Sequence, residues 1–230
     1  RSAPFLAKFN ALQACIEGSP HPYILALDAD AVLVNRISSS AIAAVLEDRE
    51  LAMVEQPRIV GSHMRRQEFL DHYIRHTNVW FGNTSEIPQL DSFRFYNSGV
   101  VIGQREGLRR FLAWAQTQLA RKTGDHRVGK HMISDQDYYQ YWTNAINPGA
   151  CTTLPWAWNH CEYWDEAFPR SGARILHFSN FCLRPTRFQL GEMAFLSRRG
   201  IGDDDSFIRI YAGARKYILM ALSKLRAAAG

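Results

Sequence analysis

Short apolar runs alternate with helix-like segments along most of this chain. The first clear run, from Tyr23 to Leu27, is apolar throughout and stops at Asp28. This pattern predicts a short strand that is buried on both faces, as in the interior of a parallel sheet covered by helices. Residues 4–16 repeat apolar side chains at helical spacing, and residues 41–46 and 51–54 are typical of a capped helix and a second strand. The alternation predicts an α/β fold.

Two amphipathic helices and an interrupted strand are predicted next. Residues 67–81 and 106–122 each gather apolar side chains on one helical face. Residues 94–103 form two strand-like runs joined by Asn-Ser-Gly, which indicates a bulge, a close backbone approach to a ligand, or a plain turn. His72 and His76 share a helical face and could bind zinc. No third ligand accompanies them, and this favours ordinary histidines at the surface or the edge of the core.

The last third of the chain predicts a capped helix, a short strand and a final helix. Ser134 is a good N-cap, and capping alone explains Asp135 and Asp137 in the first turn that follows. Residues 153–160 are aromatic and broken by proline, which suits a pocket wall or a core, and residues 174–179 indicate a strand. Residues 207–225 predict a basic amphipathic helix that docks on the domain, with attachment to a membrane surface as the alternative.

Composition narrows the class of partner. A length of 230 residues with 47% hydrophobic content suffices for one large domain with a core. The net charge of +5 favours anionic partners such as a nucleotide diphosphate or a lipid surface. Nucleic acid is not expected as a partner, because the arginine pairs are scattered and no DNA-binding motif is present. The four cysteines show no C-x-x-C spacing, so we expect a reducing, cytoplasmic location, with peripheral membrane contact as a second option.

Asp28 and Asp30 are the first candidate chemical groups. They lie one residue apart at the carboxyl end of the predicted first strand, where open α/β sheets bind ligands. Two carboxylates at such a place are costly unless a cation neutralises them, and oxygen ligands suit Mg²⁺ or Mn²⁺ shared with a phosphate. A solvated turn in which one aspartate caps a helix stays open as the alternative.

A family becomes visible when the order of the motifs is considered. An apolar strand ending in Asp28-x-Asp30 is followed by Phe95-Tyr96-Asn97-Ser98-Gly99-Val100 and Asp135-Gln136-Asp137. Leu154-Pro155, Trp158-Asn159 and Ile175-Leu176-His177-Phe178 then precede Arg184-Pro185. This succession, which spans roughly residues 8 to 185, resembles the retaining GT-A glycosyltransferases, in particular family 8, the glycogenin and lipopolysaccharide galactosyltransferase type.

The resemblance implies a Rossmann-like mixed sheet with flanking helices. It divides the chain into a catalytic domain, residues 1–205, and the basic amphipathic helix, residues 206–230. Members of the family carry a nucleotide-binding βαβ segment before the Asp-x-Asp strand, and this chain begins after most of that segment. We therefore expect an N-terminally truncated domain, with replacement of those strands by other structure as the alternative.

The resemblance also implies a metal site. Asp28 and Asp30 match the family's metal-binding Asp-x-Asp, and His177 matches its third protein ligand. The expected cofactor is a divalent cation, Mn²⁺ or Mg²⁺, which would bridge both phosphates of a nucleotide-sugar donor. Arg184 lies near the family's diphosphate-binding lysine, although the spacing is one residue longer and arginine replaces lysine.

Further roles carry over to the substrate. Asn97 matches the residue that touches the donor sugar, and Ser98 and Gly99 allow the backbone to approach the ligand. Asp135 and Gln136 match the Asp-Gln pair beside the reactive carbon of the sugar, so they are the candidate catalytic residues. Asn159 is a further candidate for substrate binding.

The implied reaction is transfer of a hexose from a nucleotide-diphosphate sugar to a hydroxyl acceptor. A UDP-sugar is the favoured donor, the acceptor is a glycan or a lipid-linked molecule, and retention of configuration is expected.

Two other functions remain open from the sequence. An apolar strand before Asp28-x-Asp30, with the later run Gly202-Asp203-Asp204-Asp205, also resembles haloacid-dehalogenase-type phosphohydrolases, in which Asp28 would be the nucleophile. That hypothesis leaves Asn97, Asp135 and His177 unexplained. The third hypothesis is a non-catalytic, transferase-like module that binds a nucleotide-sugar or a partner protein.

Overall fold

The computed structural model describes residues 7–56, 66–82, 92–122, 126–161, 170–179, 187–202 and 206–228. The chain divides into two compact units. The first comprises Arg1–Asp28 and Ser38–Leu154, and the second comprises Ala29–Ile37 and Pro155–Gly230. Arg184 and Asp203 to Asp205 of the predicted motifs lie outside the described residues.

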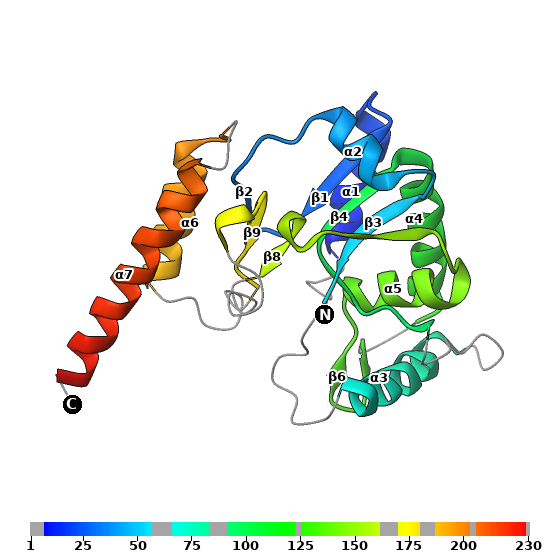
Figure 1. The fold of residues 1–230 in the computed structure, drawn as a ribbon. Helices are drawn as coiled ribbons and strands as arrows, with labels where there is room; N and C mark the ends of the chain where they lie inside the picture. Colours follow the sequence, from blue (N-terminus) through cyan, green and yellow to red (C-terminus); the bar gives the residue numbers. More distant parts are fainter. Residues whose placement is uncertain are drawn as a thin grey trace. The chain divides into compact units, whose positions relative to one another are not determined.

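The first unit is built on a four-stranded mixed sheet with the strand order β1-β4-β3-β7 (Figure 1). β1 pairs with β4 and β3 pairs with β4 in antiparallel fashion, whereas β3 and β7 run parallel. A separate two-stranded antiparallel ribbon is formed by β5 and β6. The strands of the first unit are β1 (Tyr23–Leu27), β3 (Leu51–Glu55), β4 (Tyr96–Gln104), β5 (Arg127–Val128), β6 (His131–Met132) and β7 (Cys151–Leu154).

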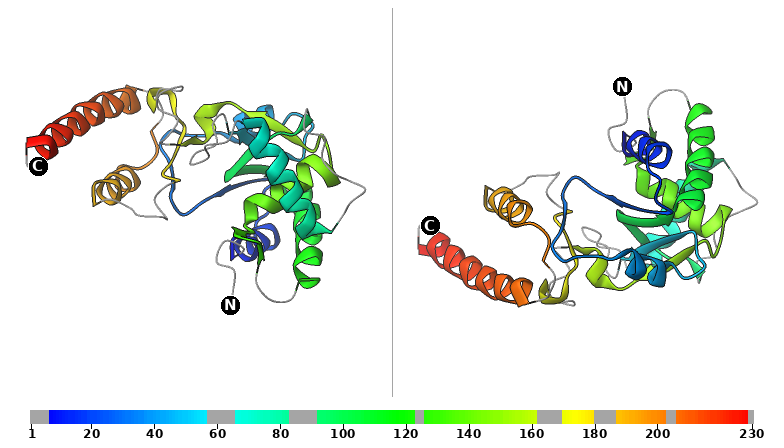
Figure 2. Two further views of the ribbon diagram at one scale, coloured as in Figure 1. Left: turned by 90° about the horizontal axis from the view of Figure 1, so that it is seen from below. Right: turned by 90° about the horizontal axis from the view of Figure 1, so that it is seen from above.

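Helices cover both faces of this sheet. Figure 2 shows α1 and α4 beside each other on one side of the sheet, with α2 on the other. Leu51 and Met53 of β3 pack in the main core with Phe9 of α1 and Phe111 of α4, and Ala52 between them is also fully buried. The helices are α1 (Ala7–Gly18), α2 (Ser39–Leu46), α3 (Arg66–Phe81), α4 (Arg105–Ala120), α5 (Asp135–Tyr141) and the π-helix η3 (Trp142–Ile146).

The second unit has its own three-stranded sheet with the strand order β2-β9-β8. β2 and β9 run antiparallel, whereas β8 and β9 run parallel. Its small core joins Val32 and Val34 to Leu176, Leu196 and Ile208. Its elements are β2 (Ala31–Leu33), η4 (Trp156–Trp158), β8 (His160–Cys161), η6 (Arg170–Gly172), β9 (Ile175–His177), α6 (Arg187–Arg199) and α7 (Ser206–Ala228).

The predicted α/β class, with a mixed sheet and flanking helices, is confirmed. The position of the first strand was wrongly predicted. β1 has the predicted bounds, but among the described strands it is an edge strand that pairs only with β4, and Ile24 is its one fully buried residue. A short apolar run does not encode its neighbours, because strand order and direction depend on pairing with distant segments.

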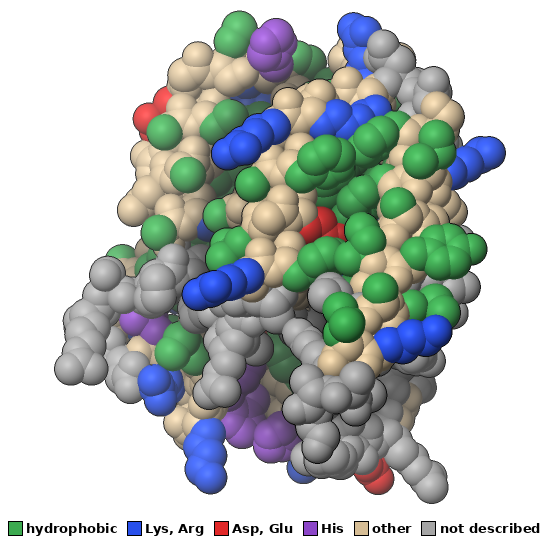
Figure 3. Space-filling view, turned by 90° about the vertical axis from the view of Figure 1, so that its left-hand side faces the viewer, with side chains coloured by type: hydrophobic (Ala, Val, Ile, Leu, Met, Phe, Trp, Pro, Cys, Tyr) green, Lys and Arg blue, Asp and Glu red, His purple; other side chains and the backbone are tan. Residues whose placement is uncertain are grey.

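Most of the α7 side chains that the structure describes are exposed or only partly buried. Ile208 and Arg215 are buried, whereas Ile210, Tyr217 and Leu225 of the predicted apolar stripe are 67–73% exposed. Hydrophobic side chains gather on the face formed by α6 and α7 (Figure 3). In the described part of the chain, no helix is both long and apolar enough to span a membrane.

Candidate active site

The carboxyl end of β1 brings Asp28 to the middle of β4. The pairing of these strands runs from Tyr23 opposite Gln104 to Leu27 opposite Val100. One step further, the backbone N–H of Asp28 donates a hydrogen bond to the carbonyl of Gly99, at 2.8 Å. Strand pairing therefore holds the backbone of Asp28 beside the Asn-Ser-Gly segment.

The Asn-Ser-Gly segment lies at a β-bulge, which is one of the alternatives that the sequence left open. Ala52 of β3 lies opposite Ile102, but Val54 lies opposite Asn97, so β4 carries extra residues between the two pairs. The side chain of Asn97 accepts a hydrogen bond from the backbone N–H of Gly99, at 2.9 Å. This local bond satisfies the backbone within the irregular stretch and holds Asn97 and Ser98 in a defined, buried position.

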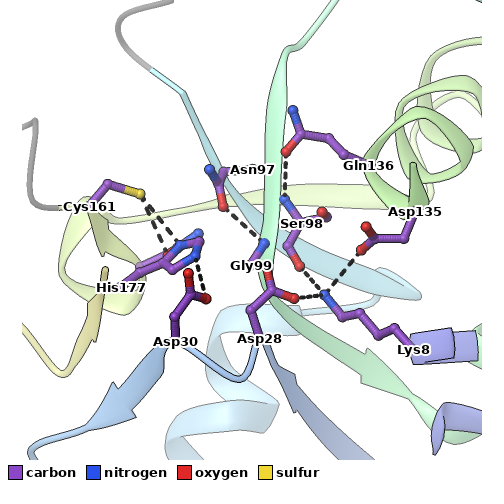
Figure 4. A network of polar contacts seen from close by, with 11 residues as sticks. Lys8, Asp28, Asp30, Asn97, Ser98, Gly99, Asp135, Gln136, Cys161 and His177 are labelled. Carbon is purple, nitrogen blue, oxygen red and sulfur yellow. Dashed lines mark hydrogen bonds and ion pairs between the residues drawn. The ribbon is translucent and has the colours of Figure 1, made fainter. Parts of the chain in front are cut away.

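Lys8 of α1 is a site residue that sequence reasoning missed. Its ammonium lies 2.7 Å from Asp28 Oδ1 and 3.2 Å from Asp135 Oδ2, and it donates to the carbonyl oxygen of Ser98 (Figure 4). Lys8 precedes the buried Leu12 by one helical turn, so it is a cation on the apolar face of the helix. That placement was a signal, because lysine is rarely buried without a partner.

Opposing charges govern the ionisation of this cluster. Burial alone works to lower the pKa of Lys8, but the carboxylates of Asp135 and Asp28 outweigh it, and the pKa is raised above its ordinary value. Burial raises the pKa of Asp135, and the proximity of Asp28 adds to the increase, while Lys8 opposes it. Lys8 therefore supplies the positive charge that two neighbouring carboxylates need.

The two acids at the start of α5 have different roles. Asp137 accepts hydrogen bonds from the backbone N–H and the hydroxyl of Ser134, at 2.7 and 3.0 Å, and so completes a capping box. Asp135 instead faces Lys8. Between them, the side-chain oxygen of Gln136 accepts from the backbone N–H of Ser98 at 3.4 Å. Capping therefore explains Asp137 but does not account for the ion pair of Asp135.

In the second unit, Asp30 and His177 meet across the antiparallel pair of β2 and β9. The carbonyl of Asp30 accepts from the backbone N–H of Phe178, and the carboxylate lies 3.4 Å from His177 Nε2. Both residues are about 95% buried. Burial works to lower the pKa of His177, but its bonds to Asp30 and Cys161 outweigh burial and raise the pKa to about 10.

Asn159 fixes the orientation of His177. Its side-chain oxygen lies 2.9 Å from His177 Nδ1 and can only accept, so Nδ1 carries a proton and Nε2 is the atom that faces Asp30. Cys161 Sγ lies 3.6 Å from the same Nδ1 (Figure 4). Asn159 is fully buried, and the role that the geometry supports for it is to orient the His177 ring.

The side chains of Asp30 and His177 in the second unit, and of Asp28 in the first, carry atoms of the kind that bind divalent cations. Asp30 offers a carboxylate and His177 an imidazole nitrogen, and both are buried and already near each other. Asp28 belongs to the first unit, but only Ala29 separates it from Asp30, so the chain keeps their Cα atoms within about 7 Å. The expected diphosphate-binding residue, Arg184, lies outside the described residues.

Comparison with known proteins gives fold similarities only. No family profile matches the chain, and no curated protein sequence matches it. Among solved structures, the apo form of mouse xyloside xylosyltransferase 1 matches with a TM-score of 0.45 and 20% identity, over 81% of this chain and 68% of that one. The apo bifunctional glycosyltransferase WbbM matches with a TM-score of 0.49 and 14% identity, over 78% of this chain.

Both of these proteins are glycosyltransferases by name. The chain spans about a third of the length of WbbM, 32%.

Proposed function

We propose that this chain is a metal-dependent glycosyltransferase of the retaining GT-A type, similar to family 8. It transfers a hexose from a nucleotide-diphosphate sugar, with a UDP-sugar favoured, to a hydroxyl of a glycan or lipid-linked acceptor. The supporting observation is the convergence of motifs that are far apart in sequence. Asp28 lies with Asp135 and the Ser98 segment in the first unit, and Asp30 lies with His177 in the second.

The proposed metal ligands are Asp28, Asp30 and His177, one donor atom from each. Asn159 holds the His177 ring so that Nε2 faces the ion position. A bound Mn²⁺ or Mg²⁺ would neutralise the charge that develops on the diphosphate as the bond between sugar and phosphate breaks.

The remaining residues act on the sugar. Asn97, Ser98 and Gly99 form a rigid bulge along which the donor sugar lies, and Asp135 and Gln136 face the same segment. The bond between the anomeric carbon and the phosphate oxygen breaks, and its electron pair stays on the nucleoside diphosphate. A new bond forms to the acceptor oxygen, whose proton passes to the departing diphosphate. The carboxylate of Asp135 stabilises positive charge on the ring as the bond breaks.

Lys8 positions Asp28 and Asp135 in this scheme. Two carboxylates so close together would repel each other, and one would take up a proton without a cation between them. Burial raises the pKa of Asp135, and the ammonium of Lys8 opposes that rise and lowers the cost of placing the carboxylate in a buried site. Lys8 is therefore assigned a positioning role.

Isothermal titration with UDP, GDP and their sugars, with and without Mn²⁺, tests the proposal. We expect nucleotide binding that requires Mn²⁺ and that weakens at least about tenfold in Asp30→Ala. Asp48→Ala is the matched control, because Asp48 is an exposed aspartate in the first unit. It should leave the affinity unchanged.

Two outcomes would contradict the proposal. Nucleotide binding that does not depend on metal, with Asp30→Ala unaffected, would favour a binding module without this active site. Release of inorganic phosphate from a phosphorylated sugar, abolished in Asp28→Asn, would favour the phosphohydrolase. If nucleotide binding requires Mn²⁺, the next experiment is a screen of nucleotide-sugar donors with the longest natural form of the protein. That screen identifies the sugar and the base.

A further inference from the structure

A pocket of about 290 Å³ opens in the first unit, next to the start of α5. Its walls come from α3, β6, α5 and the residue just before β4. Three aromatic rings and three imidazoles dominate the lining: Phe69, Tyr73, Phe95, His72, His76 and His131. The volume is close to the lower end of the range for small-molecule sites, which is enough for one or two sugar rings.

The aromatic wall is rigid. Tyr73 and Phe95 are buried and pack edge to face, with ring centres 5.0 Å apart. Phe69 stacks on Tyr73 at 5.9 Å with an interplanar angle of 18°, and it is only partly buried. A partly exposed ring held by two buried rings offers an apolar surface on which the C–H face of a pyranose can pack.

Fixed polar groups line the other side of the pocket. Tyr73 donates its hydroxyl hydrogen to Asp137 Oδ1 at 2.6 Å, and His131 Nε2 lies 3.0 Å from the same oxygen. The ring centres of His72 and His76 are 4.5 Å apart, and His76 Nε2 lies 3.1 Å from the carbonyl oxygen of Val128. Imidazole rings can donate to or accept from sugar hydroxyls, so this wall suits a hydroxyl-rich ligand.

The charge of the pocket argues against an anionic ligand. No lysine or arginine is among the lining residues in the described part of the chain. Asp137 contributes a negative charge, and its hydrogen bond raises the pKa of His131, the group that lies beside it. A diphosphate would find no fixed cation here, whereas a neutral glycoside requires none.

Gln136 connects this pocket to the proposed reaction site. Its side chain lines the pocket, and its oxygen accepts from the backbone N–H of Ser98. The preceding residue, Asp135, pairs with Lys8 (Figure 4). A hydroxyl at the inner end of the pocket would therefore lie next to the residues assigned to the donor sugar.

We propose that this pocket binds the acceptor of the reaction, a neutral glycoside whose terminal ring packs on Phe69 and whose hydroxyls bond to His72, His76 and His131. The role of the ligand as acceptor rests on the proposed transferase function. Its class, a neutral glycoside, rests on the lining of the pocket alone. It gives the paired histidines of α3 a role in recognition.

Nuclear magnetic resonance of the histidine ring protons tests the pocket directly. The full chain, without nucleotide or metal, is titrated to millimolar excess with methyl glycosides of glucose, galactose, mannose and xylose, and with lactose and maltose. We expect saturable shifts of the His72, His76 and His131 signals with at least one of these sugars. The signal of His21, which lies before β1 and outside the pocket, is expected to stay constant.

Two variants and a control define the site. Phe69→Ala should weaken the binding at least fivefold, and so should His72→Ala, which changes an exposed side chain and should leave the fold intact. Phe195→Ala removes a phenylalanine of the second unit that is 53% exposed, and it should have no effect. Shifts that survive both pocket variants would place the sugar elsewhere and overturn the proposal.

The remaining outcomes separate this inference from the proposed function. If no glycoside shifts the histidine signals while Mn²⁺-dependent nucleotide binding is observed, the acceptor assignment is wrong and the transferase proposal stands. If glycosides bind in the pocket but nucleotide binding needs no metal, the transferase proposal fails and the pocket remains a saccharide site. Shifts produced by Zn²⁺ and by none of the sugars would assign the histidines to a metal and overturn the inference.

Discussion

Replacing Lys8 by methionine removes a positive charge that lies between Asp28 and Asp135. The ammonium lies 2.7 and 3.2 Å from the two carboxylates, and the side chains of Lys8, Asp28 and Asp135 are 16%, 34% and 11% exposed. Methionine keeps most of the apolar stem of lysine, so the change chiefly tests the charge. It also leaves the carbonyl of Ser98 without this donor.

The exposure of the three side chains sets the size of the effect. Removal of one partner from a fully buried pair costs about 3–5 kcal/mol, and an exposed pair contributes about 0–1 kcal/mol. Asp28 is about one-third exposed and partly screened by solvent, so we expect the free energy of unfolding to fall by about 2 kcal/mol at neutral pH. For a chain of this size, that loss corresponds to a decrease in Tm of about 4–8 °C.

The loss should depend on pH in a defined direction. Burial already raises the pKa of Asp135, and removal of Lys8 raises it further. The penalty in Lys8→Met is therefore fully present above the raised folded pKa of Asp135, shrinks as the pH falls through that pKa, and is gone below the unfolded pKa of an aspartate, because a protonated Asp135 needs no cation. Urea denaturation at neutral and at mildly acidic pH measures both values.

A matched variant and a double mutant complete the experiment. Lys130→Met changes an exposed lysine in the first unit and should cost less than about 0.5 kcal/mol. In the Lys8→Met background, Asp135→Asn should recover part of the lost stability, because it removes the unpaired charge. A Lys8→Met penalty no larger than that of Lys130→Met, or one that grows as the pH falls, would refute the reasoning.

Three further predictions concern the histidines and the last helix. The hydrogen bond to Asp137 raises the pKa of His131. The contribution of this pair to stability is therefore fully present below the unfolded pKa of histidine and is lost as the pH rises through the folded pKa. Asp137→Asn should lower the folded pKa of His131 in an NMR titration, and an unchanged value would contradict the assignment. Asn159→Ala should weaken Mn²⁺ affinity about 10–100-fold in a calorimetric titration, because His177 loses the contact that orients its ring; wild-type affinity would rule out that role. Tyr217 is 73% exposed, so Tyr217→Ser should reduce co-sedimentation with anionic lipid vesicles if α7 lies on a membrane surface, and equal sedimentation would count against that contact.

Local sequence was sufficient where the structure depends on neighbours in the chain. The bounds of β1 were predicted, because five apolar residues end at Asp28. A capped helix was predicted for residues 41–46, and Ser38 caps α2 by accepting a hydrogen bond from the backbone N–H of Ala41 within the same turn. The Asn-Ser-Gly run indicated an irregular stretch in this strand, with a bulge as one alternative, and the N–H of its glycine bonds to Asn97 two residues earlier. In each case, the partner groups lie within a few positions of each other.

The surroundings of His72 and His76 in α3 could not be predicted from local sequence. The sequence places His72 and His76 on one face and offers no third group nearby. The structure brings His131 and Asp137 to the same pocket from segments that follow much later in the chain. Their meeting depends on how α3, β6 and α5 pack together, and no spacing rule within one helix contains that information.

The sequence by itself determined the α/β class, the approximate bounds of elements such as β1 and α4, and most of the candidate groups, but it predicted neither α6 nor the role of Lys8. Only the tertiary structure decided that β1 pairs antiparallel with β4, that Lys8 lies between Asp28 and Asp135, and that Asn159 orients His177. The physical reason is the range of the interactions involved. Turns, caps and apolar periodicity join residues a few positions apart, whereas strand order and ion pairs join segments whose proximity is created by the packing of the whole unit.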